Sequence, residues 1–140
     1  MKRAVALVAQ TDVRFLTVHA VESVMRAAME GRGPSGPQLL AVTVLTSFGP
    51  ADIQELGYSC EISELVAVRT RQAMDAGVQG VVTSPLEAAA VRRMVGPGKI
   101  IVTPGVRSAG STRGDQRRVA TPPEALRAGA DYLVMGRQIT

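Results

Sequence analysis

Short apolar runs alternate along this chain with longer stretches in which apolar residues recur every three to four positions. The short runs predict β-strands, and the longer stretches predict amphipathic helices. The predicted strands cover residues 14–20, 38–46, 78–84, 99–103 and 131–135. The predicted helices cover residues 2–10, 22–30, a short turn from 50, 63–76, 86–95 and a segment from 122 to 128, with a Gly/Pro loop at 31–37.

The order of these elements predicts a parallel sheet. The run QLLAVTVLT at 38–46 is too continuous for a strand with one exposed face, so it should be buried on both faces. Strands alternate with helices through short connections, which is typical of right-handed parallel crossovers. The phrases DAGVQGVVTS at 75–84 and RAGADYLVMG at 127–136 share a helix end, an Ala-Gly turn and a buried strand, as successive copies of one unit would. With no linker in sight, we expect a single α/β domain over residues 1–140.

Helix and strand ends carry further expectations. Ser63 resembles a helix-capping residue for the segment 63–76. In a parallel sheet all carboxyl ends of strands lie on one face, and polar or glycine residues gather there in this sequence: His19, Thr46, Ser47, Ser84, Thr103 and 135–137. The opposite ends carry Asp12, Gln79, Lys99 and Asp131. Ligand chemistry is therefore expected at the carboxyl ends.

Three segments at this face predict an anion site: Thr103-Pro104-Gly105-Val106-Arg107, Gly114 to Arg118, and Gly136-Arg137. Arginine offers a fixed fork of donors, and glycine lets backbone N–H groups approach an oxyanion. Phosphate fits such a site best. The loop also carries three arginines that we expect on a solvated face, where they raise the local potential: Arg113, Arg117 and Arg118.

Charge and composition narrow the partners. The net charge is +4 and the pI about 10.0, with 16 Lys and Arg of which only Lys2 and Lys99 are lysine. Aromatic residues make up only 3%, and no nucleic-acid reading motif is present, so an anionic small molecule is favoured over nucleic acid. The single Cys60 excludes an internal disulfide, and there is no signal-peptide pattern and no apolar run of membrane-spanning length. We expect a cytosolic protein without a membrane partner. The only histidine, His19, is expected to be a hydrogen-bonded structural residue rather than a general base or metal ligand.

Longer phrases of the sequence resemble a known family. TVHA at 17–20, VTVLTS at 42–47 and VTPGVRSAGSTRGDQRRVATPPEALRAGADYLVMGR at 102–137 are similar to the later part of orotidine 5'-phosphate decarboxylase. This resemblance implies a (β/α) barrel of the TIM type that is present here in part, with strands four to eight of eight. It implies a homodimer, or at least a homo-oligomer, that acts on a phosphorylated pyrimidine nucleotide without metal or organic cofactor.

The resemblance also implies roles for residues. Arg137 and the Gly136 N–H would hold the phosphate, and Gln116 would close over it. Arg107 would line the substrate site, and Thr46 would lie near the nucleotide. No catalytic residue is carried over, because the family's Asp-x-Lys-x-x-Asp array is absent from this sequence.

Two alternatives remain open on the sequence. The first is another barrel enzyme that acts on a sugar phosphate. The second is a non-catalytic phosphate-binding half-barrel that assembles with a partner. Five parallel strands would leave two sheet edges that favour association. We therefore expect a partial barrel that does not turn over substrate by itself.

Overall fold

Five strands form one sheet in the order β1-β2-β3-β4-β5, and every neighbouring pair is parallel. The structure is a computed structural model that describes residues 1–107 and 118–136. The strands are β1 Phe15–His19, β2 Gln38–Val42, β3 Gly80–Val82, β4 Ile100–Thr103 and β5 Tyr132–Leu133. The helices are α1 Lys2–Val8, α2 Glu22–Arg32, α3 Pro50–Glu55, α4 Ile62–Asp75, α5 Ala88–Val95 and α6 Pro122–Arg127. The predicted parallel α/β architecture is confirmed.

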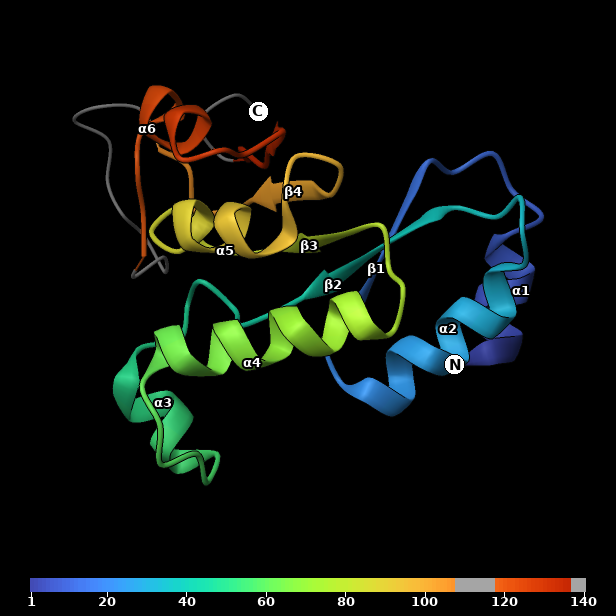
Figure 1. Cartoon of the computed structure of the whole chain (residues 1–140), viewed down its shortest axis with the longest axis horizontal. Coiled ribbons are helices and arrows are strands. Elements are labelled where there is room, and N and C mark those ends of the chain that lie inside the picture. The colour runs from blue at the N-terminus through green and yellow to red at the C-terminus, as the bar shows by residue number, and fades with distance from the viewer. Residues whose placement is uncertain (108–117, 137–140) are drawn as a thin grey trace.

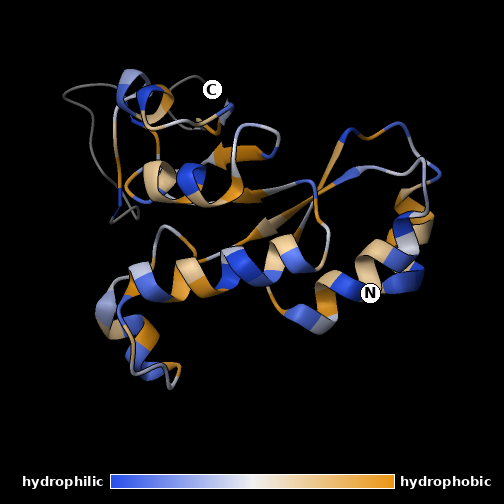
Figure 2. Ribbon diagram, viewed as in Figure 1, coloured by the Kyte–Doolittle hydropathy of each residue, from blue (hydrophilic) through white to orange (hydrophobic). Residues whose placement is uncertain are grey.

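The sheet is apolar on both faces. One face packs against the helices, where Met25, Leu39, Val81 and Ile101 are fully buried. Helices α4 and α5 lie side by side along this face (Figure 1). The other face carries a second apolar cluster of Leu40, Val82, Val102 and their half-buried neighbours. Figure 2 shows the apolar strands beside helices whose apolar and hydrophilic residues alternate. Burial on both faces explains why the strands read as continuous apolar runs.

The sheet is bent so that its two outer strands approach each other. Phe15 lies in β1 and Tyr132 in β5, yet their rings meet edge to face with centroids 5.1 Å apart. The guanidinium of Arg14 lies 5.0 Å from the Phe15 ring centroid and 5.8 Å from that of Tyr132. Since β1 and β5 do not pair, this contact requires a concave face between them. The described sheet is therefore an arc of a barrel.

Two glycines let elements approach closely. A Cβ on Gly80 would lie 2.3 Å from the Ile100 carbonyl oxygen, so a larger residue would obstruct the pairing of β3 with β4. A Cβ on Gly31 would lie 2.3 Å from the Lys2 carbonyl oxygen, where α1 crosses α2. Gly31 was predicted to begin a loop, but α2 continues through it to Arg32. This glycine serves helix packing rather than helix termination.

Other boundaries also differ from the sequence prediction. Strand β2 ends at Val42 rather than Thr46, and the other strands are shorter than predicted. Helix α4 begins at Ile62 with Glu61 at the cap, so the predicted capping role of Ser63 was wrong. Glu61 adopts the extended conformation that precedes a helix. Glu64 places a negative charge in the first turn, where it interacts favourably with the helix dipole. None of the described helices is long and apolar enough to cross a membrane.

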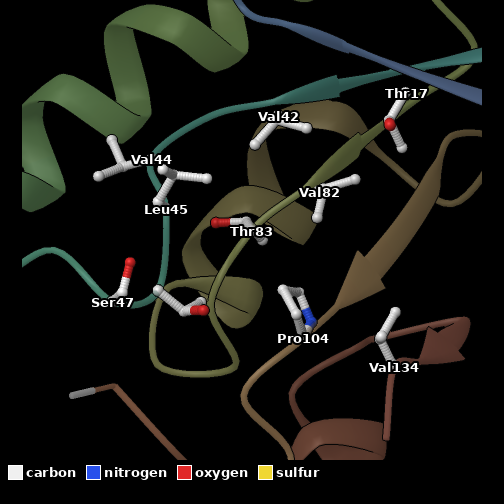
Figure 3. A pocket seen from close by; sticks show the side chains of 10 residues that line it. Thr17, Val42, Val44, Leu45, Ser47, Val82, Thr83, Pro104 and Val134 are labelled. Atoms are coloured by element: carbon white, nitrogen blue, oxygen red, sulfur yellow. The ribbon is translucent and has the colours of Figure 1, made fainter. Parts of the chain in front are cut away.

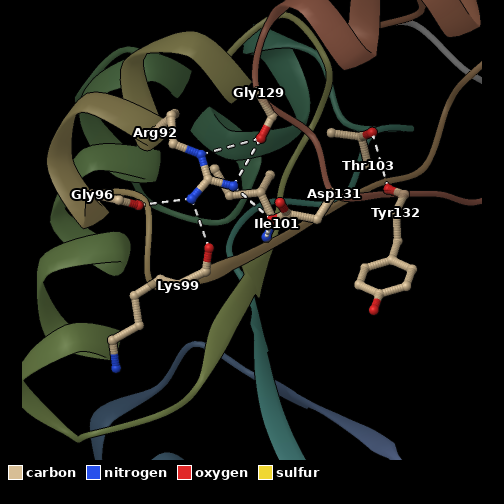
Figure 4. Close-up of polar contacts among 8 residues, drawn as sticks. All are labelled: Arg92, Gly96, Lys99, Ile101, Thr103, Gly129, Asp131 and Tyr132. Carbon is tan, nitrogen blue, oxygen red and sulfur yellow. Dashed lines mark hydrogen bonds and ion pairs between the residues drawn. The ribbon is translucent and has the colours of Figure 1, made fainter.

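The amino ends of β4 and β5 are joined through Arg92 of α5 (Figure 4). Arg92 Nε and Nη2 donate to the Gly129 carbonyl at 3.2 and 2.9 Å, and Nη1 donates to the Gly96 and Lys99 carbonyls, both at 2.7 Å. Nη2 also lies 2.6 Å from Asp131 Oδ2, an oxygen that accepts the Ile101 N–H at 2.7 Å. One guanidinium thus satisfies three carbonyls and a carboxylate at the face opposite to the predicted site.

Replacing Arg92 with methionine should lower the free energy of unfolding by about 2–3 kcal/mol, because three carbonyls and Asp131 lose a charged donor together. Urea denaturation of the purified chain measures this loss. Lys2→Ala is the matched control, since the Lys2–Glu30 pair is 64% and 63% exposed and should change stability by at most about 0.5 kcal/mol. Equal effects of the two substitutions would contradict a structural role for Arg92.

Candidate functional site

A pocket of about 350 Å³ opens at the carboxyl ends of the strands (Figure 3). Every strand, or the segment that follows it, contributes to its wall, which consists of Thr17, Val42, Val44, Leu45, Thr46, Ser47, Val82, Thr83, Pro104 and Val134. The wall is mainly aliphatic with four hydroxyl groups. Such a lining suits a small organic molecule with an apolar body and a few hydrogen-bonding groups.

Only some of the predicted site residues lie at this pocket. Thr46 lies in the pocket wall and is only 6% exposed. Pro104, from the segment 103–107, forms another part of the wall. Gly136 is exposed two residues beyond the lining residue Val134, and a Cβ built on it meets nothing within 4 Å. The structure thus brings Thr46, Pro104 and the chain that leads to Gly136 to one pocket.

Arg107 is not part of the pocket wall. It is half-buried, and its Nη1 donates to the Val106 carbonyl at 2.9 Å. Its backbone N–H donates to the Ala120 carbonyl at 2.9 Å, and Val106 and Ala120 form an isolated parallel bridge. The two ends of the predicted phosphate loop therefore run together. Gln116 and Arg137 lie outside the described residues, so their predicted roles stay predictions.

Arg118 differs from the prediction most clearly. Its side chain was expected on a solvated loop face, but the residue is only 7% exposed. Nη2 donates to the Val44 carbonyl at 3.1 Å and the Leu45 carbonyl at 2.9 Å, and Nη1 lies 2.9 Å from Glu87 Oε2. The expectation of a solvated arginine was wrong because two backbone carbonyls and a carboxylate converge on this position.

Valine-threonine pairs end three neighbouring strands. Val42, Val82 and Val102 are register partners across β2, β3 and β4, so the threonines that follow occupy equivalent positions. These threonines are almost fully buried: Thr43, Thr83 and Thr103. The repeated Val-Thr sequence was the signal that could have revealed this row.

The hydroxyl groups of the row are not equivalent. Thr43 Oγ1 donates to the Val82 carbonyl at 3.0 Å, and Thr103 Oγ1 donates to the Tyr132 carbonyl at 3.5 Å. In each case the acceptor is a carbonyl of the next strand. Thr83 Oγ1, by contrast, has no hydrogen-bond partner within residues 1–107 and 118–136. Thr83 therefore buries a hydroxyl group in the pocket wall without compensation.

Other polar groups contribute less to the pocket. His19 is exposed, and its side chain makes no hydrogen bond with the described part of the chain, so the expected structural hydrogen bond was wrong. Lys99 Nζ donates to the Val78 carbonyl at 2.7 Å, at the amino end of the sheet as predicted. Within the described ranges, no group of three or more His, Cys, Asp or Glu side chains could hold a metal ion.

Glu124 fixes the start of α6, which follows the bridge at Ala120. Its Oε2 accepts the Thr121 backbone N–H at 2.8 Å and the Thr121 hydroxyl at 2.7 Å. These hydrogen bonds lower the pKa of Glu124 below its ordinary 4.5. The ionised Glu124 carboxylate therefore contributes to the free energy of folding above pH 4.5. This contribution is lost as the pH falls through the lowered pKa.

The bent parallel sheet, its covering helices and a small-molecule pocket at the carboxyl ends define a protein of the (β/α) barrel class. Comparison with known proteins gives the family within this class. The family described as "Orotidine 5'-phosphate decarboxylase / HUMPS family" matches residues 1–140, and the chain belongs to it.

Individual relatives agree with this assignment. The orotidine 5'-phosphate decarboxylase of Nitrobacter winogradskyi is 53% identical over 139 residues, which are 99% of this chain and 58% of that protein. The decarboxylase of Methylobacterium radiotolerans is 56% identical over 126 residues, which are 90% of this chain and 54% of that protein. The crystal structure of orotidine 5'-phosphate decarboxylase from Lactobacillus acidophilus superposes with a TM-score of 0.79 at 29% identity, covering 97% of this chain and 60% of that one. The chain thus spans little more than half the length of the curated relatives that it matches.

The Thr83→Val substitution should leave the free energy of unfolding unchanged or raise it by about 1 kcal/mol, because it removes a buried hydroxyl group that has no partner. The equivalent Thr43→Val is the control. It removes the 3.0 Å donor to the Val82 carbonyl and should lower the free energy of unfolding by about 1 kcal/mol. Urea denaturation of both variants compares the two sites. An equal loss in both would mean that Thr83 makes a stabilising hydrogen bond after all.

Proposed function

We propose that this chain forms the phosphate-binding part of an orotidine 5'-phosphate decarboxylase, the enzyme that converts orotidine 5'-phosphate to UMP. The observation that supports it most is the pocket at the carboxyl ends, whose wall includes Thr46 and Pro104, in a chain that matches the family over residues 1–140. In this proposal Thr46 lies beside the nucleotide, and Arg107 lines the approach to it. Gln116, Gly136 and Arg137 bind the phosphate.

A phosphate held at one end of a substrate can assist chemistry at the other end. The dianion provides binding energy that is available to orient the substrate and stabilise the transition state. The reacting end needs the Lys and Asp groups of the family array, and neither lysine of this chain can replace them. Lys2 lies in α1, and Lys99 donates to Val78 at the amino end of the sheet. We therefore propose that the isolated chain binds the nucleotide but does not decarboxylate it.

The missing chemistry would come from a polypeptide that adds strands beside β1 and β5, the outer strands of the described sheet. Strand edges expose backbone donors and acceptors that pair readily with another chain. Self-association through the same edges would give the homo-oligomer that we also propose. The lysine positions favour a non-catalytic binding role for the chain alone, with catalysis restored by its complement.

Calorimetric titration with UMP tests the phosphate assignment. The wild-type chain should bind UMP, and Arg137→Ala should weaken binding by about 1.5–3 kcal/mol because a charge-assisted hydrogen bond is lost. Arg26→Ala is the matched control, since Arg26 forms an exposed pair with Glu22 on α2. Unchanged UMP affinity in Arg137→Ala would remove Arg137 from the site, and no binding by the wild-type chain would refute a nucleotide site in this chain alone.

Complementation tests the catalytic part of the proposal. The purified chain alone should release no CO₂ from orotidine 5'-phosphate. Addition of the part of the Nitrobacter winogradskyi relative that has no counterpart here, about 40% of that protein, should restore release. Release by the chain alone would show that it carries its own catalytic groups. A stable complex without activity would instead favour the assembly role.

A further inference from the structure

Arg118 joins the chain segments that follow two neighbouring strands. Its Nη2 bonds to the carbonyls of Val44 and Leu45, which follow β2 and form part of the pocket wall. Its Nη1 pairs with Glu87, which lies in the turn between β3 and α5. Arg118 is buried and Glu87 is largely covered, with side-chain exposures of 9% and 14%. Together with the two carbonyl hydrogen bonds, this ion pair therefore fixes the distance between the segment that follows β2 and the turn between β3 and α5.

The same stretch also joins the end of β4. Ala120, two residues after Arg118, accepts the Arg107 backbone N–H at 2.9 Å and bridges to Val106. Val106 is fully buried two residues after Pro104, a lining residue of the pocket. Residues 118–120 are thus attached to β2 and β3 at one end and to the segment after β4 at the other. The three segments carry most of the pocket wall.

Stability alone does not explain the buried pair. Arg118 Nε and Nη1 and Glu87 Oε2 are buried and make no well-aligned hydrogen bond within the described ranges, although Nη1 and Oε2 lie at ion-pair distance. Buried charges with incomplete hydrogen bonding cost more than apolar side chains of similar size. Apolar side chains at both positions would remove this cost. What the pair supplies in return is a defined arrangement of three chain segments around the pocket.

We propose that Arg118 and Glu87 are positioning residues for the pocket. Their ion pair holds the Val44–Leu45 wall, the turn before α5 and the segment paired with Arg107 in the arrangement that a phosphorylated ligand requires. Neither residue is assigned a contact with the ligand. This inference rests on the proposed nucleotide site and adds the device that organises it.

The double variant Arg118→Met/Glu87→Met tests this role, because it replaces both charges with apolar side chains and leaves no single buried charge. Its melting temperature should fall only modestly, because the Val44 and Leu45 carbonyls lose a donor while the cost of two buried charges is removed. Its preference for UMP over uridine should fall by about tenfold or more, since the phosphate-specific part of binding depends on the arrangement. The matched control is Arg26→Met/Glu22→Met on the exposed face of α2, which should retain the preference. A folded Arg118/Glu87 double variant with unchanged preference would overturn the proposal.

Hydrogen exchange of the Arg107 amide tests the arrangement without any ligand. This N–H bonds to Ala120, so loosening residues 118–120 should expose it. In Glu87→Gln, which keeps the side-chain shape, exchange at Arg107 should accelerate by about tenfold relative to exchange at Ile101 in the sheet core. Equal exchange rates in wild type and Glu87→Gln would overturn the proposal whether or not UMP binds. Failure of the wild-type chain to bind UMP, with accelerated exchange in Glu87→Gln, would refute the nucleotide site and leave the positioning role supported.

Discussion

Val42, Val82 and Val102 lie in register across three parallel strands, and the site is built on this alignment. Because the strands run in one direction, whatever follows each valine emerges at the same edge of the sheet. A threonine follows in all three cases, and its backbone continues the pairing from Thr43 to Val82 and from Thr83 to Val102 at 3.0 and 3.1 Å. Beyond these threonines the three segments diverge and enclose the pocket. If one strand shifted its register by one residue, each of its side chains would move to the other face of the sheet.

The two ends of the sheet use arginine in different ways. At the amino ends, Arg92 donates to three carbonyls and an aspartate, and nearly all its donors are satisfied. At the carboxyl ends, Arg118 is more deeply buried but leaves Nε without an acceptor in the described part of the chain. The first arrangement is what a stabilising contact requires. The second is less favourable energetically, because its buried charges are incompletely hydrogen-bonded, and it lies beside the pocket.

The sequence was sufficient for the fold and only partly sufficient for the site. Continuous apolar runs such as 38–46 identify parallel strands because both faces of the sheet are buried. The burial of Arg118 could not be foreseen, since its acceptors at Leu45 and Val44 lie 73 and 74 residues away in the chain. Gly31 was misread for a similar reason: the close approach of Lys2 in α1, rather than a turn, is what requires a glycine there. Local pattern predicts elements, whereas these residues are determined by contacts between elements.

The contact between Phe15 and Tyr132 bears on how the arc could accept further strands. A polypeptide that adds strands between β5 and β1 would have to pass between these rings or displace them, because they meet across the concave face at 5.1 Å. An aromatic pair of this kind contributes about 0.5–1.5 kcal/mol beyond its buried area. Each added strand would pair a row of backbone groups and bury apolar side chains worth about 1.5–3 kcal/mol apiece. The ring contact alone is therefore weaker than the gain expected from one added strand, so its loss would not prevent a complement from joining the arc.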